Sequence, residues 1–305
     1  MKARASRLRP GSRVALVAPA GPVPAALLAD GIAILESWGL RVEVGKHVLD
    51  RHPTLPYLAG LDAHRAADLQ QAWCDPDVDA VICVRGGYGC LRMVDLLDWD
   101  AMSAAGPKVF VGSSDITVLH DSFAEHLDVV TLFGPMVGTN AFVSDAVARE
   151  HLRQSLFDPD KVQVLTGPQT ATMVHGVATG VLVGGNSSLL DARLGAPDTR
   201  PPNNAILLLE DITEDPYRLD RIFTSLLRAN WFTGVNGIAL GSWTECGKPG
   251  EVEAVLTDLI GSLGIPTVWE LGFGHCAGQL TVPLGALAEL DADNGTLTVL
   301  KPALL

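Results

Sequence analysis

The sequence lacks any uninterrupted apolar run of the roughly 18 to 20 residues that a membrane-spanning helix requires. The apolar run that follows the basic N-terminus, residues 14–18, ends at Pro19 and is too short for the core of a signal peptide. The sequence therefore predicts a protein that is neither embedded in a membrane nor exported.

Positive charge is scarce. The chain of 305 residues carries 22 Lys and Arg against 35 Asp and Glu, a formal net charge of −13. Nucleic acids are held mainly by Lys and Arg on their phosphates, and the only basic run is residues 1–9, which we expect to be a solvated arm. Nucleic acid is thus excluded as a partner. Hydrophobic residues make up 48% of the chain, enough for a large core.

Cysteine is also rare, with five residues and no Cys-x-x-Cys pair. An odd number of unpaired cysteines favours reduced thiols in a cytoplasmic protein, most of them acting as small buried hydrophobic residues. They are Cys74, Cys83, Cys90, Cys246 and Cys276.

Patterns that bind metals are missing as well. Metal ligation needs several His, Cys or carboxylate groups that converge, and here the only close pair is His275–Cys276, whose adjacent side chains point apart. We predict no metal and no cofactor. The remaining histidines lie in helical or polar contexts that are typical of surface or packing roles; they are His47, His52, His64, His120, His126, His151 and His175.

The first half alternates short β-branched runs with helical stretches, which predicts an α/β domain with a parallel sheet. Turn-rich sequence near residues 157–171 marks the boundary. We therefore predict an α/β domain over residues 1–160 and a smaller, more strand-rich domain over residues 161–305. Strands are expected in the first domain at 14–18, 41–44, 80–84 and 109–111, with helices at 25–38, 63–73, 91–97, 117–126 and 144–155.

The second half shows short strands with turns between them. Asn294-Gly295 between alternating apolar residues predicts a hairpin. The expected strands are 180–183, 205–209, 237–240, 267–269, 279–282, 287–290 and 296–300, and the expected helices are 187–194, 218–228 and 251–263.

Gly112-Ser-Ser-Asp115 follows an apolar strand and opens a helix. A serine at such a turn presents its hydroxyl outside the sheet, and the next N–H lies near the positive helix end, where an oxyanion can be held. Ser114 fits a nucleophile better than Ser113 because Gly-x-Ser places it at the apex. The alternative is an ordinary helix N-cap, and the last glycine of Gly-x-Ser-x-Gly is absent.

Arg85-Gly-Gly-Tyr-Gly89 is a second glycine-rich turn after a buried strand. It matches neither a P-loop nor Gly-x-Gly-x-x-Gly, so nucleotide binding through those motifs is not indicated. The glycines either form a tight turn with positive φ or bring N–H groups close to a substrate.

A hydroxyl nucleophile needs a base, and an imidazole serves best when a carboxylate orients it. Glu210 ends an apolar strand, and His275 lies in a glycine-flanked loop. Ser114, His275 and Glu210 together supply the three groups. Asp211 and Asp115 are alternative carboxylates, and solvated charge or N-capping is the alternative role for Glu210.

Taken together, these segments resemble the LD-carboxypeptidase family, which includes muramoyltetrapeptide carboxypeptidases and microcin C immunity carboxypeptidases. The resemblance runs in order along almost the whole chain. It rests on residues 14–22 (VALVAPAGP), 79–89 (DAVICVRGGYG), 111–117 (VGSSDIT), 134–136 (GPM), 184–190 (GGNSSLL), 209–211 (LED), 216–221 (PYRLDR), 274–275 (GH) and 280–285 (LTVPLG).

The resemblance implies a homodimeric serine peptidase with a Ser-Glu-His triad at Ser114, Glu210 and His275. It places the oxyanion donors on the N–H groups of Asp115 and of the glycine turn, for which we choose Gly87. Such enzymes cut an L-to-D peptide bond, typically releasing D-alanine from a murein tetrapeptide in cell-wall recycling. Two departures affect the expected substrate: Ser113 stands where an aromatic residue is common, and Phe133 where histidine often stands.

A terminal carboxylate must also be held, and Arg85 and Arg92 near the glycine turn, together with Gly86, are the candidate substrate-binding residues. The alternative substrate is a microcin C-like peptidyl- or aminoacyl-nucleotide, which needs an aromatic residue to stack on the base. Trp243, expected in a turn after a strand, is the candidate, and loop packing is its other reading. A third possibility, a binding protein without catalysis, conflicts with the presence of all three triad residue types.

Overall fold

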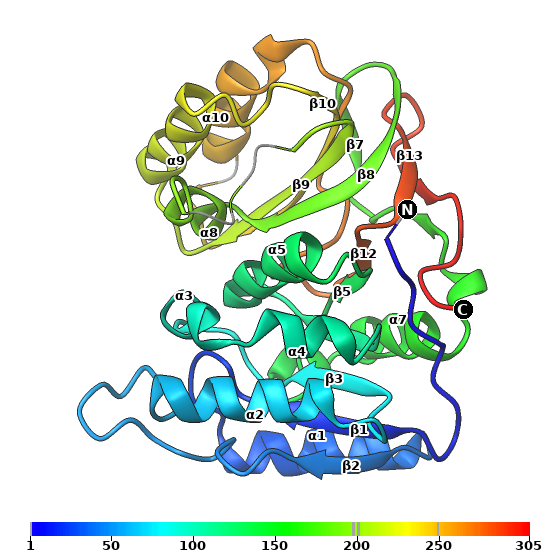
Figure 1. The fold of residues 1–305 in the computed structure, drawn as a ribbon. Helices are drawn as coiled ribbons and strands as arrows, with labels where there is room; N and C mark the ends of the chain where they lie inside the picture. The colour runs from blue at the N-terminus through cyan, green and yellow to red at the C-terminus, as the bar shows by residue number, and fades with distance from the viewer. Residues whose placement is uncertain (1, 197–198, 200–201, 249) are drawn as a thin grey trace.

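Two lobes, each built on its own sheet, make up the molecule, and the first lobe lies below the second in Figure 1. The computed structural model describes residues 2–196, 199, 202–248 and 250–305. None of the helices within these residues is both long and apolar enough to span a membrane. The predicted α/β class is confirmed.

The first sheet has six strands in the order β12-β5-β4-β3-β1-β2. All neighbours are parallel except the β12–β5 pair. The strands are β1 (Arg13–Val17), β2 (Arg41–Val44), β3 (Ala80–Cys83), β4 (Val109–Gly112), β5 (Thr131–Phe133) and β12 (Val282–Leu284).

Helices cover both faces of this sheet, and its central strands β3 and β4 are accordingly buried along their whole length. In β1, Val14 and Leu16 face α1, α6 and α7, whereas Ala15 and Val17 face α2, α4 and α5. The helices are α1 (Ala25–Ser37), α2 (Asp62–Cys74), α3 (Cys90–Met93), α4 (Trp99–Ala104), α5 (Thr117–His126), α6 (Asn140–Val143) and α7 (Ala146–Phe157), with short 3₁₀ turns η1 (Val94–Leu96), η2 (Ser114–Ile116) and η3 (Pro159–Lys161).

The second sheet has eight strands in the order β6-β14-β13-β8-β9-β10-β11-β7. Its centre, from β8 to β11, is parallel, and both flanks are antiparallel. The strands are β6 (Val164–Leu165), β7 (Ala171–Val174), β8 (Val177–Asn186), β9 (Ala205–Ile212), β10 (Val235–Thr244), β11 (Thr267–Trp269), β13 (Leu287–Asp291) and β14 (Thr296–Val299).

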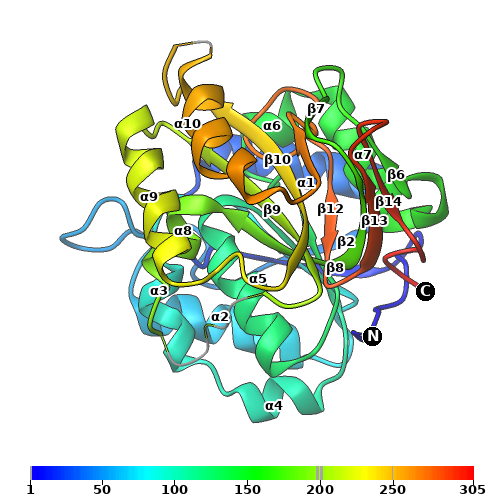
Figure 2. The ribbon, with the colours of Figure 1, turned by 90° about the horizontal axis from the view of Figure 1, so that it is seen from above.

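Three helices pack on one face of the second sheet, as the view from above shows (Figure 2). Leu219 and Phe223 from α9 meet Leu207 and Leu209 of β9 in one cluster of buried side chains. The helices are α8 (Ser187–Ala192), α9 (Pro216–Arg228) and α10 (Glu251–Leu259), followed by the 3₁₀ turn η4 (Gly261–Leu263).

Most predicted elements are present within a few residues, and three expectations need correction. The strand expected at 279–282 is β12, three residues later, and it belongs to the first sheet. Trp243 lies inside β10 rather than in a turn after it. The N-terminal segment is not a solvated arm, because Ala5 and Leu8 are buried in the cluster between the first sheet and helices α1, α6 and α7. Met1 lies outside the described residues.

Candidate active site

Ser114 stands at a strained turn between β4 and α5. Its φ is 62°, in the left-handed region that residues with a Cβ seldom adopt. Such strain at a strand-to-helix turn is characteristic of an exposed nucleophile. Ser114 is partly exposed, whereas its neighbour Ser113 is buried. The turn therefore presents Ser114, the predicted nucleophile, and hides Ser113.

The glycine turn after β3 lies directly against Ser114. A Cβ built on Gly86 would lie 2.9 Å from Cβ and 3.2 Å from Oγ of Ser114. Gly87 has a φ of +103° and is exposed. Glycine is needed at both places, at Gly86 for the close approach and at Gly87 for the backbone angle.

Asp115 links the two turns through its side chain. Its Oδ2 accepts a hydrogen bond of 2.8 Å from the N–H of Cys90, the first residue of α3. The carboxyl is buried, and burial raises its pKa despite the N–H donors around it. Arg65 secures the same turn by donating to the carbonyl oxygens of Gly89 and Pro19. The sequence predicted roles for the N–H and the carboxylate of Asp115 but none for Arg65.

His275 and Glu210 form a hydrogen-bonded pair. The Nδ1 of His275 lies 2.7 Å from Oε2 of Glu210, whose side chain is fully buried, while His275 remains 23% exposed. Burial works against the imidazolium, but the Glu210 charge and hydrogen bond outweigh it, so the pKa of His275 is raised. An imidazole held in this way can accept a proton on its other nitrogen.

The loop that carries His275 is fixed by β10. Ser242 N–H donates to the Phe273 carbonyl at 2.9 Å, and Thr244 Oγ1 donates to the His275 carbonyl at 2.6 Å. Gly274 has a φ of +97°, and a Cβ there would lie 2.7 Å from Glu210 Oε2. Only glycine brings the histidine loop this close to the carboxylate.

Asn186 also belongs to the site, although no role was predicted for it from the sequence. Its Nδ2 donates to Glu210 Oε1 at 3.2 Å and to Asp211 Oδ1 at 2.9 Å. Its N–H donates to Thr117 Oγ1 at 3.0 Å. Asn186 thus ties the carboxylate to a residue three positions after Ser114. The available signal was a polar residue after the Gly184-Gly185 pair at a strand end.

The alternative carboxylates have other partners. Asp211 accepts hydrogen bonds from Ser188 N–H and Oγ at 2.9 and 2.7 Å, and burial together with the Glu210 charge raises its pKa to about 6. Asp115 is bound to Cys90. Of the three candidates, the structure pairs Glu210 with His275.

The candidate substrate residues are placed differently from one another. Arg85 is exposed, and its Nη1 donates only to the Pro22 carbonyl at 3.0 Å among the described contacts. Arg92 is paired with Asp62 at 2.9 Å. Trp243 is 8% exposed and stacks on Trp269, at a centroid distance of 6.3 Å, in the cluster between the second sheet and its helices. Its surroundings are those of a packing residue.

All five cysteines are free, and Cys83, Cys90 and Cys246 are buried. Cys276 is partly exposed and lies next to His275, so it could compete with Ser114 as a nucleophile. Burial raises its pKa to about 11, so its thiol is protonated at neutral pH and is a poor competitor for the nucleophile role.

Comparison with known proteins identifies the family of the chain. Residues 14–134 match the LD-carboxypeptidase N-terminal domain, and residues 179–290 match the C-terminal domain. A putative carboxypeptidase of Streptomyces coelicolor is 56% identical, covering 99% of this chain and 97% of that protein.

A murein tetrapeptide carboxypeptidase of Pseudomonas aeruginosa is 32% identical over 92% of this chain and 94% of its own length. The fold also matches the self-immunity protein MccF in complex with glutamyl sulfamoyl guanosine, with a TM-score of 0.86, 21% identity and 99% of both chains covered. The chain belongs to the LD-carboxypeptidase family and is a serine-type peptidase.

Proposed function

We propose that this carboxypeptidase cuts an L,D-peptide bond and releases terminal D-alanine from murein tetrapeptide, with Ser114, His275 and Glu210 as its triad. The observation that carries the proposal is the bond of 2.7 Å between His275 Nδ1 and the buried Glu210 carboxylate. The strained, partly exposed Ser114 and the relative that acts on murein tetrapeptide support it.

In the proposed reaction, His275 takes the proton of Ser114 as Oγ attacks the substrate carbonyl carbon. Negative charge then develops on the carbonyl oxygen, and the N–H groups of Asp115 and Gly87 are the proposed donors to it. His275 passes its proton to the leaving amine as the peptide bond breaks. Water, deprotonated by the same imidazole, attacks the acyl-enzyme, and His275 returns that proton to Ser114 Oγ as the ester bond breaks and the shortened peptide leaves.

We assign the terminal carboxylate of the substrate to Arg85 rather than Arg92. Arg92 is already neutralised by Asp62, whereas Arg85, the exposed first residue of the glycine turn, donates only to a backbone carbonyl among the described residues. A guanidinium can grip a carboxylate with two parallel hydrogen bonds. Gly86, against the nucleophile, leaves room for the scissile bond.

We further propose that the protein is cytoplasmic and forms a homodimer. Free thiols in all five cysteines fit a reducing compartment. The dimer follows from the family resemblance, and light scattering on the purified chain tests it: a mass near 32.2 kDa would contradict the dimer.

A second candidate function is hydrolysis of a peptidyl- or aminoacyl-nucleotide, and one observation favours it. Two exposed tyrosines lie at the glycine turn: Tyr57 packs against Tyr88 of the turn, the two are 49% and 43% exposed, and their ring centroids are 5.8 Å apart. Exposed aromatic rings can stack on a base. With Trp243 buried in the core, this pair is the better platform.

Mass spectrometry of purified protein with murein tetrapeptide tests the proposal. We expect loss of one D-alanine, abolished in Ser114→Ala and retained in Ser113→Ala, a matched control because Ser113 is the adjacent buried serine. Hydrolysis of an aminoacyl sulfamoyl nucleotide with the tetrapeptide left intact would overturn the murein assignment in favour of the second candidate.

A further inference from the structure

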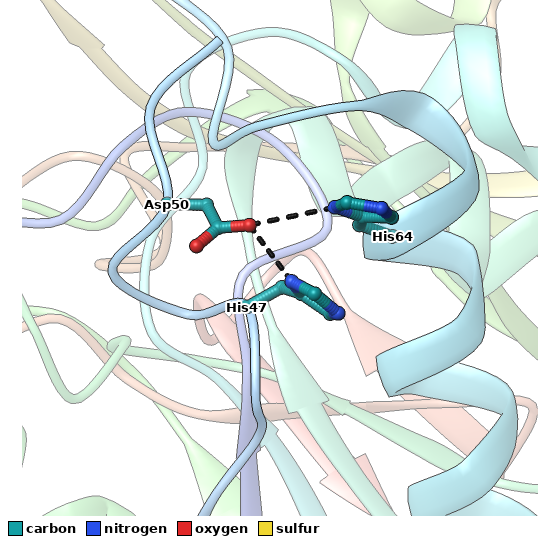
Figure 3. A group of neighbouring side chains, drawn as sticks. All are labelled: His47, Asp50 and His64. Atoms are coloured by element: carbon teal, nitrogen blue, oxygen red, sulfur yellow. Dashed lines mark hydrogen bonds and ion pairs between the residues drawn. The ribbon is translucent and has the colours of Figure 1, made fainter.

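Three side chains outside the active site converge on one point. His47 Nδ1 lies 2.7 Å from Asp50 Oδ2, and His64 Nδ1 lies 3.5 Å from the same oxygen (Figure 3). The two imidazole rings stack, with centroids 4.0 Å apart. One potential ligand atom from each residue falls within 4.8 Å of the other two. Among the described residues this is the one such group of three.

The backbone holds these side chains in place. His47 N–H donates to the buried Asp68 carboxylate at 2.7 Å, and Asp68 lies on α2 one helical turn after His64. Asp50 packs against Gly60, where an added Cβ would lie 2.9 Å from Asp50 Cβ. The loop residues and the helix residue are therefore anchored to each other by contacts that do not involve the three side chains.

The chemistry of the three atoms selects a class of ligand. Two imidazole nitrogens and one carboxylate oxygen suit Zn²⁺ and similar transition ions better than Mg²⁺ or Ca²⁺, which prefer oxygen alone. With bonds of about 2.0 to 2.1 Å, the ligand atoms of a tetrahedral zinc lie roughly 3.3 Å apart. The observed separations of 2.7 and 3.5 Å from Asp50 Oδ2 bracket that value.

The geometry points to a binding site for a divalent transition ion of the zinc class at His47, Asp50 and His64. Asp50 and His64 are 40% and 43% exposed, so an ion can enter from solvent and keep a water as its fourth ligand. The neutral imidazole of His47 binds the ion through Nδ1 when its proton is on Nε2, and the ion joins the loop to α2.

Binding there would steady the loop that borders the active site. The loop, residues 45–61, continues from Asp50 to Tyr57, whose ring meets Tyr88 of the glycine turn. Ala59 N–H also donates to the Ala20 carbonyl at 3.0 Å. The ion is thus assigned to the base of this loop and takes no part in the proposed hydrolysis.

Zinc titration by calorimetry tests the inference, using tag-free full-length protein freed of metal with a chelator. We expect one equivalent of Zn²⁺ to bind, and Co²⁺ to give visible absorption bands of tetrahedral coordination. His64→Ala and Asp50→Asn should each weaken binding at least tenfold. Both changes lie at partly exposed side chains, and circular dichroism checks that the variants fold.

The matched control is His175→Ala, which removes an imidazole from the pair His175–Asp293, 2.8 Å apart, that has no third ligand nearby among the described residues. It should bind Zn²⁺ as the wild type does. Failure of the wild type to bind, or unchanged binding in both His64→Ala and Asp50→Asn, would overturn the site. Binding lost only in His275→Ala would place the ion at the active site and overturn it equally.

Discussion

Gly86 and Ser114 are in such close contact that a methyl group at Gly86 would lie 2.9 Å from the Ser114 Cβ. The two residues come from different strand ends, after β3 and β4, which are neighbours in the first sheet. The proposed nucleophile is therefore positioned partly by the absence of a side chain on the adjacent turn.

Gly86→Ala should lower kcat/KM by roughly ten- to hundredfold, because a displacement of the nucleophile by a fraction of an ångström to one ångström costs that much. Gly86 is buried, and the added methyl would also lie 3.3 Å from Cε of Met136, so unfolding in urea is measured alongside to separate a loss of stability from the loss of activity. Gly261→Ala is the control: its added Cβ would meet only Thr257 at 3.6 Å. Equal activity of both variants would mean that the close contact does not position Ser114.

Replacing Ser114 by glycine should stabilise the protein relative to Ser114→Ala by about 1 kcal/mol, since glycine adopts positive φ without strain. Both variants lack the hydroxyl, so the comparison isolates the backbone angle of 62°. The free energy of unfolding, measured by urea denaturation, is the readout. If Ser114→Ala were the more stable, the turn would not be strained.

The pair His275–Glu210 predicts a pH dependence. The base works only when neutral, so kcat/KM should rise with pH through the raised pKa of His275, above its usual value near 6.5. In Glu210→Gln the stabilising charge is lost, and this rise should shift to lower pH. We also expect kcat to fall on the order of 10⁴-fold, as when a triad carboxylate becomes an amide.

Measuring kcat and kcat/KM of the wild type and of Glu210→Gln between pH 5 and 9 checks both the shift of the pH profile and the fall in kcat. Glu210→Asp serves as the control that keeps the charge and should keep the rise near its wild-type pH. A Gln variant with an unshifted profile would show that another group sets the protonation of His275.

Asp211 predicts a pH dependence of stability. Its pKa is raised from 3.8 to about 6 in the folded protein, so the folded state holds a proton that the unfolded state has already released. Stability from this group is present below about pH 4 and is lost as the pH rises through about 6. A shift of two pKa units corresponds to a loss on the order of 3 kcal/mol.

Asp211→Asn should remove this dependence, because an amide does not titrate. Urea unfolding at pH 4 and pH 8 checks it: the variant should gain relative to the wild type on going to pH 8. The Asn side chain keeps one oxygen for the Ser188 donors. An equal change in both proteins would contradict the raised pKa of Asp211.

Local sequence predicted the features that depend on local chemistry. Glycine and serine after buried apolar runs marked the two turns at the ends of β3 and β4, and the parallel order of these strands brought the turns together. The family resemblance supplied the choice among carboxylates, and the bond between His275 and Glu210 agrees with it. Ser114, Glu210 and His275 lie on three separate segments, and the local sequence alone does not show that these segments meet.

Features that depend on distant pairing were not predictable. The β12 segment carries no local sign that it will join the first sheet, because a strand of three residues pairs equally well with any open edge. Trp243 was expected in a turn because Gly241 precedes it, but β10 continues past an irregularity between Leu240 and Trp243. The basic residues of the N-terminal segment predicted a solvated arm, so the burial of Ala5 and Leu8 between them was not expected.

The β12–β5 pairing limits how the enzyme can open. His275 precedes β12 by seven residues, and Val282 of β12 is paired with Phe133 of β5, the strand next to the one that ends before Ser114. Val282 and Leu284 also pack in one cluster with Leu208 of the second sheet, so a rigid swing of one lobe away from the other would uncover them. We therefore expect the segment that follows His275 to stay tied to the sheet that carries Ser114 when substrate enters and leaves.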